Sequence, residues 1–245
     1  MAKVVAFTSG KGGTGKSTVS AELACTLARY GRSVLIVDME SGLRSLDYLL
    51  GLEDRVVFDL GDVFSGKCGL AEALSPHREY PLLKLACLPD GAAPARESLQ
   101  PVFCAAEEMF DYILLDLPAG IGSTVRMAAE FADLFCLVTL PDRIAARDSR
   151  ATLEMLRGER ELPARLLINR VDAASMRSGG FENLDDLMDF VGAPLLGVIP
   201  EDRSIRSAKL VPERRKKRLS ATEDIFDAIA CRIMGRYVPL ILTTV

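Results

Sequence analysis

A glycine-rich loop between a short apolar run and a helical pattern is the strongest constraint on the fold of this 245-residue chain. The apolar run covers residues 4–7, and four glycines and two lysines then fall within residues 10–17. A segment with so few side chains packs almost nothing, so its backbone amides are available for another purpose. Its order satisfies the pattern G-x-x-x-x-G-K-[ST], in which a loop after a strand turns its amides around phosphate oxygens.

Each residue type in this loop suits a bound phosphate chain. Glycine permits the backbone conformations of the turn, and the positive end of the helix that begins at Ser17 attracts phosphate oxygens. Lys16 would neutralise the β and γ phosphates, and the Ser17 hydroxyl would bind Mg²⁺. The loop therefore predicts that ATP or ADP binds with Mg²⁺ through Gly10, Lys11, Gly12, Gly13, Thr14, Gly15, Lys16, Ser17 and Thr18.

Apolar runs alternate with segments of helical periodicity along the whole chain. Runs that are apolar on both faces are typical of strands inside a parallel sheet, and they cover residues 4–7, 34–37, 83–88, 112–115, 135–139, 166–168 and 195–199. Helical spacing covers residues 17–30, 99–110, 143–156 and 222–234. The alternation predicts an α/β phosphate-loop NTPase with a doubly wound, mostly parallel sheet and helices on both faces, in a single domain over residues 1–245. We expect its apolar tail, residues 238–245, to pack on the body or form an edge strand, with an exposed end as the alternative.

Composition excludes several kinds of site. His77 is the only histidine, so a histidine metal cluster and a Ser-His triad both lack parts. The six cysteines include no C-x-x-C pair and several lie in apolar runs, so we predict buried free thiols in a reducing compartment. No apolar run approaches the roughly 18 residues of a membrane-spanning helix, and residues 1–7 are too short for a signal-peptide core. We therefore expect a cytoplasmic protein.

Two predicted strands end in carboxylates that suit the metal of a bound nucleotide. Asp116 follows the run at residues 112–115 and precedes a Leu-Pro-Ala-Gly turn, and Asp38 follows another such run. Alternation along an extended chain points Asp38 and Glu40 to the same side. We expect Asp38 and Asp116 to bind Mg²⁺ together with Ser17, and Glu40 to face the metal and the attacking water. The alternative for each acid is a helix N-cap or loop residue.

The sequence Lys-Gly-Gly-Thr-Gly-Lys-Ser-Thr at residues 11–18 resembles the deviant phosphate loop of the MinD/ParA family of ATPases. Further blocks resemble this family in one order along nearly the whole chain: residues 42–47 with Gly51, 55–59, 116–121, 147–149, 168–170 and 197–202. The loop indicates the family, and the blocks at residues 42–59 and 197–202 favour its MinD branch.

The resemblance implies an ATP-dependent homodimer, with weak ATPase activity, that places the cell-division septum. In a monomer Lys11 would lie beside the cationic Lys16, whereas in a dimer it would reach the nucleotide of the partner subunit. The catalytic set implied by the family is then Lys11, Lys16, Asp38, Glu40 and Asp116.

The resemblance also assigns a base pocket and a docking face. Asn169 would hydrogen-bond adenine, with a turn residue at a strand end as the alternative, and Pro200 and Glu201 would form a wall of the pocket. Regulators of the MinC and MinE type would dock near Arg147 and Asp148, for which a surface ion pair is the alternative.

Three departures from the family pattern stand out. Glu40 replaces an aspartate, and one extra methylene misplaces the carboxylate enough to slow hydrolysis by a factor on the order of 10². Ser45 replaces an asparagine, which would alter switch behaviour. The sequence ends in the apolar tail where relatives carry a basic amphipathic membrane helix. For peripheral binding at the inner face of the membrane, another segment such as residues 214–218 would contact lipid; otherwise membrane binding was lost or the sequence is truncated.

A basic stretch leaves other functions open. Residues 214–218 are five consecutive cations in a chain of net charge −4, and Arg203, Arg206 and Lys209 precede them. The stretch is either a solvated face or a site for an anionic partner such as DNA or lipid headgroups. The alternatives to septum placement are a ParA-like partition ATPase that binds DNA through residues 203–218, a flagellar-placement relative, and a nucleotide-gated binding module with negligible turnover.

Overall fold

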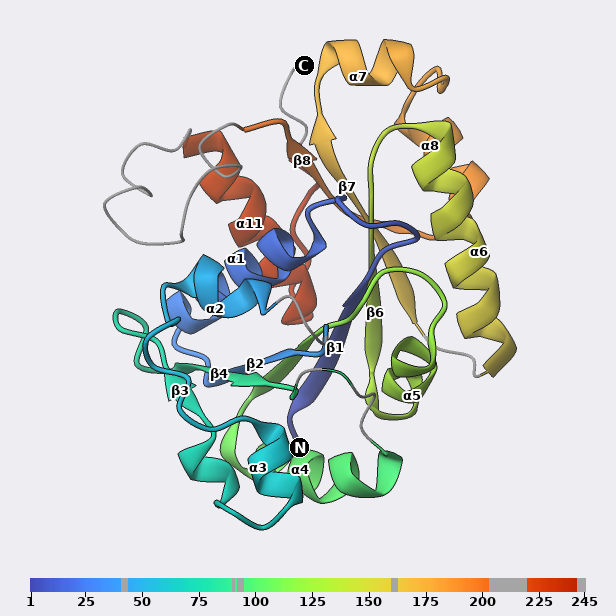
Figure 1. Ribbon diagram of the computed structural model, residues 1–245. Helices are drawn as coiled ribbons and strands as arrows, with labels where there is room; N and C mark the ends of the chain where they lie inside the picture. Colours follow the sequence, from blue (N-terminus) through green and yellow to red (C-terminus); the bar gives the residue numbers. More distant parts are fainter. Residues whose placement is uncertain (41–43, 90, 92–94, 160–162, 203–219, 242–245) are drawn as a thin grey trace.

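The computed structural model describes residues 1–40, 44–89, 91, 95–159, 163–202 and 220–241. These residues form an eight-stranded sheet in the order β3-β4-β2-β5-β1-β6-β7-β8 (Figure 1). The strands are β1 (Lys3–Thr8), β2 (Val34–Asp38), β3 (Ser75–Pro76), β4 (Leu83–Cys87), β5 (Tyr112–Asp116), β6 (Leu134–Thr139), β7 (Ala164–Val171) and β8 (Leu195–Pro200). Neighbouring strands run parallel except β3, which pairs antiparallel with β4 at one edge.

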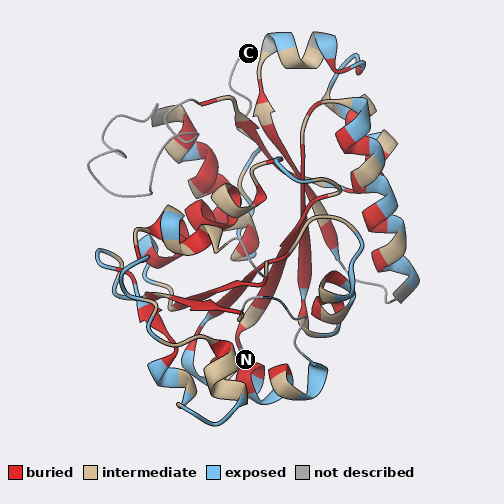
Figure 2. Ribbon diagram, in the orientation of Figure 1, coloured by how far each residue is buried: buried red, intermediate tan, exposed pale blue. Residues whose placement is uncertain are grey.

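Helices cover both faces of the sheet, as predicted. Successive residues of a strand point to opposite faces, and in β1 Val4 and Ala6 enter one apolar core while Val5 and Phe7 enter the other. Helices α1 (Lys16–Arg29), α2 (Ser45–Leu50) and α11 (Ser220–Ile233) pack on the second core. The first core is covered by α3 (Leu60–Phe64), α4 (Arg96–Met109), α5 (Ser123–Phe131), α6 (Arg143–Glu159) and α8 (Leu184–Val191). Buried residues accordingly follow the sheet and the inner sides of the helices (Figure 2).

All seven predicted strands and all four predicted helices are present, with shifts of a few residues at their ends. The prediction missed the short elements α2, α3, α5, α8, β3, η1 (Leu70–Glu72) and α7 (Ala173–Ser178). Several of these are too short to show a helical period, and side-chain caps mark their starts instead. Asp59 accepts hydrogen bonds from the first turn of α3, and Asp172 does the same for α7.

The described part of the apolar tail, residues 238–241, forms no strand and packs on the body only in part, since Leu240 is 44% exposed. The Arg232 guanidinium of α11 donates to the carbonyl of Leu196 in β8 and to that of Val238 in the tail. Ile241 packs against the second core. Residues 242–245 lie outside the described part of the chain.

The cysteine prediction is correct in part. Cys25, Cys87 and Cys136 are buried and belong to no disulfide, and burial raises the pKa of both Cys87 and Cys136 to about 12. Cys104, in contrast, is exposed on α4, because it lies on the side of that helix away from the core. Among the described residues no helix has both the length and the apolarity to cross a lipid bilayer.

Candidate nucleotide-binding site

The glycine loop joins β1 to α1 at the carboxyl edge of the sheet, and its glycines serve two purposes. Gly13 and Gly15 have positive φ angles of 81° and 87°. A Cβ at Gly10 would lie 2.2 Å from the backbone carbon of Asp148, and one at Gly15 would lie 2.4 Å from Nδ2 of Asn169. A Cβ at Gly12 would meet nothing within 4 Å. Gly10 and Gly15 therefore allow close packing, whereas the backbone at Gly12 faces open space that a ligand could fill.

Lys16 is buried among the carboxylates that the sequence indicated. Its ammonium lies 3.0 Å from Oδ1 of Asp116 and 3.7 Å from Oε2 of Glu40, with 6% of the side chain exposed. It also donates to Oγ of Ser17 at 3.3 Å. Asp116 Oδ1 accepts a further hydrogen bond, from Ser20 Oγ at 3.1 Å. The structure thus brings together four predicted site residues from β5, the end of β2 and the start of α1.

The register of β2 and β5 holds the two strand-end carboxylates, Asp38 and Asp116, side by side. Asp38 on β2 pairs directly with Asp116 on β5. Burial, followed by the charge of Asp116, raises the pKa of Asp38 from 3.8 to about 6, although the amides of Leu46 and Glu40 donate to its carboxylate. The sheet therefore stores negative charge beside Lys16 that a cation would stabilise.

The residues present fit a magnesium ion bound together with a nucleotide. Oδ2 of Asp116 is buried and has no hydrogen-bond partner in the described structure. With Asp38 and the Ser17 hydroxyl it forms a set of oxygen donors, the type that Mg²⁺ prefers. Within the described ranges no group of three or more His, Cys, Asp or Glu residues could hold a metal ion. Mg²⁺ bound with a nucleotide keeps waters and phosphate oxygens as ligands instead of using an all-protein cage.

A cavity of about 500 Å³ lies over the loop, and Glu40 is the carboxylate that borders it. The Glu40 side chain is 27% exposed, whereas that of Asp116 is fully buried and Asp38 is 2% exposed. Of the three carboxylates, Glu40 therefore has the freest access to a reacting water. The remaining lining comes from the loop and the start of α1, from α2 and the residue before it, from the turn after β5 and from the end of β7: Ser9, Gly12, Gly13, Thr14, Gly15, Lys16, Ser17, Thr18, Arg44, Ser45, Tyr48, Leu49, Ala119 and Arg170.

Lys11 lies in a different environment from Lys16. Its ammonium is 3.4 Å from a carboxylate oxygen of Asp142, and the two side chains are 33% and 36% exposed. Asp142 also accepts hydrogen bonds from the amides of Ile144 and Ala145, so it caps α6. From its position in the sequence, Lys11 is expected beside the charge of Lys16 in a monomer. Its anionic partner Asp142, which follows 131 residues later, was not predicted.

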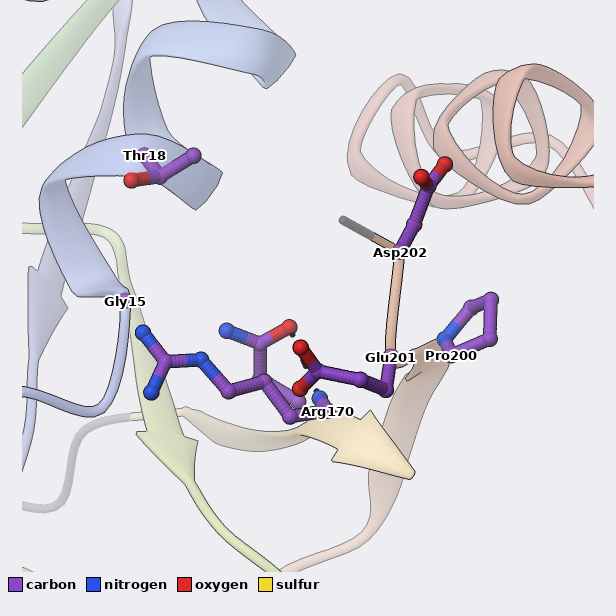
Figure 3. A pocket seen from close by; sticks show the side chains of 7 residues that line it. Gly15, Thr18, Arg170, Pro200, Glu201 and Asp202 are labelled. Atoms are coloured by element: carbon purple, nitrogen blue, oxygen red, sulfur yellow. Dashed lines mark hydrogen bonds between the residues drawn. The ribbon is translucent and has the colours of Figure 1, made fainter. Parts of the chain in front are cut away.

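The predicted base-pocket residues lie together beyond Gly15. A small pocket is lined by Gly15, Thr18, Asn169, Arg170, Pro200, Glu201 and Asp202, and Figure 3 shows the last three on β8 and the chain that follows it, facing the start of α1. Asn169 Nδ2 donates to the Thr14 carbonyl at 2.8 Å, and Arg170 N donates to Asn169 Oδ1 at 2.9 Å. The Asn169 amide thus ties β7 to the phosphate loop, and its contact with adenine stays a prediction.

Among the site residues that were not predicted from the sequence, two carry charge and bear on the nucleotide. Arg170 borders both the cavity over the loop and the small pocket, in a left-handed backbone conformation with φ 57°. Asp142 is the partner of Lys11. The preceding Asn169 was the only signal for Arg170, and nothing local in the sequence indicates that Asp142 meets Lys11.

Other predicted features have mixed outcomes. Arg147 and Asp148 form the surface ion pair given as the alternative, at 3.0 Å with Arg147 70% exposed. Ser45 begins α2 with a buried hydroxyl that has no hydrogen-bond partner within the described ranges. The basic stretch at residues 203–218 lies outside the described residues.

Comparisons with known proteins cover this whole site. The family model for the CobQ/CobB/MinD/ParA nucleotide binding domain matches residues 5–211. The septum site-determining protein MinD of Bacillus subtilis is 34% identical over an alignment of 249 positions, which covers 98% of this chain and 92% of that protein. The MinC:MinD cell division protein complex of Aquifex aeolicus matches with a TM-score of 0.82 and 30% identity over 98% of this chain and 99% of that chain.

A further solved structure is the septum site-determining protein MinD of Pyrococcus horikoshii, complexed with Mg-ADP. It has a TM-score of 0.80 and 28% identity, and the match covers 95% of this chain and 96% of that one. The residues that the family model matches include the phosphate loop, Asp38, Glu40, Asp116 and Asn169. The chain therefore belongs to the CobQ/CobB/MinD/ParA nucleotide-binding family and, within it, to the MinD ATPases.

Proposed function

We propose that this protein is a MgATP-dependent dimerisation switch, with weak ATPase activity, that places the site of cell division. One observation carries the proposal: the buried Lys16 ammonium, with Asp116 at 3.0 Å and Glu40 at 3.7 Å, lies at the mouth of a loop whose backbone faces an open cavity. The MinD relatives at 34% identity support the cellular role. On this proposal, residues 1–245 act as one ATPase domain.

The residues of the loop would bind the substrate. Its amides and the start of α1 would donate to phosphate oxygens, and Lys16 would exchange its carboxylate partners for phosphate. Asp38, Asp116 and Ser17 would hold Mg²⁺, which neutralises charge on the phosphates when it is bound. Asn169, Pro200 and Glu201 would surround the base. The Mg-ADP complex of the Pyrococcus relative is the precedent for this ligand.

Hydrolysis would transfer the terminal phosphoryl group to water. The water oxygen forms a bond to the γ phosphorus, the bond from that phosphorus to the β–γ bridging oxygen breaks, and the products are ADP and phosphate. Glu40 would orient the water, since it is the carboxylate with access to the cavity. Its contact with Lys16 and its extra methylene relative to aspartate both favour slow turnover.

Dimerisation would depend on Lys11. An ion pair between exposed groups is worth only about 0–1 kcal/mol, so the Lys11–Asp142 contact is easily exchanged. A triphosphate in the partner subunit offers Lys11 more negative charge than one carboxylate. ATP would then hold two subunits together, and loss of the terminal phosphate would release them.

The partner proteins of the switch follow from the relatives. The Aquifex MinD is in a complex with MinC, and we propose a MinC-type partner here, docked on the exposed side of α6 near Arg147. A MinE-type regulator and contact with a membrane surface remain predictions. The partition alternative is not proposed, because its DNA contact rests on residues 203–218, which lie outside the described part of the chain.

Light scattering tests the switch. With Mg²⁺ and a non-hydrolysable ATP analogue, the wild type is expected to have twice the mass that it has with ADP. Lys11→Ala should stay monomeric in both, while Lys67→Ala, which removes another exposed ion-paired lysine, should behave as the wild type does. A Lys11→Ala dimer of normal affinity would rule out the proposed action of Lys11 across the interface.

A further inference from the structure

Arg170 has a backbone conformation that only its surroundings can enforce. Its φ angle is +57°, a region that costs a residue with a Cβ roughly 1–2 kcal/mol. The β7–β8 register is irregular between Ile168 and Val171, so the intervening residues leave the regular ladder. The Arg170 amide donates to Oδ1 of Asn169, which itself holds the phosphate loop. Backbone strain of this kind is concentrated at functional sites, where it aims a side chain.

This conformation directs the Arg170 side chain at the junction of the cavity over the phosphate loop and the small pocket that contains Asn169. Arg170 also lines a third cavity, on the side of Asp142 and Asp172. A Cβ built on Gly15 would lie 3.8 Å from its Nη2. Figure 3 shows the guanidinium pointing toward Gly15, below the first turn of α1. The guanidinium thus lies between the expected positions of the phosphates and the base.

Among the described residues, the guanidinium nitrogens of Arg170 make no hydrogen bond or ion pair, and its recorded hydrogen bonds involve only the backbone. Glu201 lines the same pocket, but no ion pair joins its carboxylate to the guanidinium among the described residues, and in Figure 3 the guanidinium points away from it, toward Gly15. Gly15, the loop residue beside the guanidinium, precedes the positive end of α1, which repels a cation. An anion bound between the guanidinium and this helix end would be attracted by both.

We propose that Arg170 binds the nucleotide phosphate nearest the sugar. This inference rests on the proposed nucleotide-binding function and adds a residue to that site. The junction of the two cavities is where the phosphate chain joins the nucleoside, and a planar guanidinium presents a fork of donors that suits two phosphate oxygens. The strained backbone at residue 170 maintains this direction before the nucleotide arrives.

The test separates the guanidinium from the backbone. Glycine and asparagine both tolerate positive φ, so Arg170→Gly and Arg170→Asn remove the cation without adding strain. Arg165→Asn is the matched control, since it makes the same charge change on β7 at a residue that lines neither cavity. Calorimetry with Mg²⁺ measures ADP and ATP affinity at two salt concentrations, and thermal unfolding without nucleotide measures stability.

We expect both Arg170 variants to bind ADP and ATP about tenfold more weakly, by the same factor, as for loss of one charge-assisted contact. Their affinity should also depend less on salt than that of the wild type. Their unfolding temperatures should equal or exceed the wild-type value, because strain is relieved, and Arg165→Asn should keep wild-type affinity.

Other outcomes would overturn the proposal in distinct ways. If both variants bind nucleotide with wild-type affinity, Arg170 does not contact the phosphate. If only the ATP affinity falls, Arg170 contacts the terminal phosphate instead of the one nearest the sugar. Unchanged salt dependence indicates contact with the sugar or base instead. A lower unfolding temperature in both variants indicates a structural role. A wild type that binds neither nucleotide contradicts the proposed function itself.

Discussion

Lys11 and Lys16 lie five residues apart in one loop, but the structure gives them opposite environments. Lys16 is 6% exposed and contacts carboxylates of two strand ends, whereas Lys11 is 33% exposed and contacts the capping residue of α6. Breaking a buried ion pair strongly lowers the stability of the fold, whereas an exposed pair contributes little to it. The difference suits two tasks: Lys16 stays in place to receive phosphate, and Lys11 can leave for another partner.

Removing Lys16 should have the largest effect. Lys16→Met leaves Asp38, Asp116 and Glu40 together without a cation, so we expect the free energy of unfolding to fall by about 3 kcal/mol at pH 7.5. Urea denaturation without nucleotide measures this value. Lys11→Met is the control and should change it by less than about 1 kcal/mol. Equal losses in the two variants would contradict the comparison.

Removing the charge of Asp38 should stabilise the magnesium-free protein at neutral pH. The pKa of Asp38 is about 6 in the folded protein, above its ordinary value of 3.8. Its contribution to the stability of the fold is therefore full below pH 3.8 and is lost as the pH rises through 6. That difference is worth about 3 kcal/mol, and Asp38→Asn also loses one backbone hydrogen bond, worth about 1 kcal/mol.

We therefore expect Asp38→Asn to be about 2 kcal/mol more stable than the wild type at pH 7.5 and less stable at pH 3.5, by urea denaturation in EDTA. Asp111 provides the comparison with the opposite sign. Hydrogen bonds from Ser33 lower its pKa, so Asp111 stabilises the folded protein above pH 3.8. Asp111→Asn should accordingly destabilise at pH 7.5. If the two variants shifted in the same direction there, the cost of burying the Asp38 charge beside Asp116 would be in doubt.

Shortening Glu40 should speed hydrolysis. Glu40→Asp withdraws the carboxylate from its 3.7 Å contact with Lys16 and restores the side-chain length of the family pattern. We expect phosphate release under saturating MgATP to rise about tenfold, within the range for an ångström of misplacement. Glu130→Asp, in a surface ion pair with Arg96, should leave the rate unchanged. No gain in Glu40→Asp would count against slow turnover caused by this glutamate.

Releasing Lys11 should have the smallest effect. Asp142→Asn weakens the ion pair but keeps an oxygen that can cap α6, so stability should change little. We expect the dimer formed with a non-hydrolysable ATP analogue to be up to about fivefold tighter, the equivalent of an exposed pair of about 1 kcal/mol. Asp62→Asn, which breaks the exposed pair with Lys67, is the control. A weaker Asp142→Asn dimer would indicate that Asp142 itself contributes to the interface.

The sequence predicted the parts of the site that depend on local pattern. Apolar runs located the strands, and the loop motif and the strand-end acids located Lys16, Asp38 and Asp116. The meeting of Asp38 with Asp116 also follows from parallel strands of matching register, although it requires β2 to neighbour β5. Short capped helices such as α3 and α7 escaped prediction because they hold fewer than two turns.

The sequence by itself determined the family, the parallel sheet and the phosphate-loop chemistry, because these follow from residue types at fixed spacing within short segments. Only the tertiary structure decided which side chains lie together. It brings Lys11 to Asp142, Asn169 to the loop at Thr14, and the Arg170 guanidinium to Gly15. Those contacts join residues more than 130 positions apart. They depend on how the strands and helices pack, which no local pattern of residues contains.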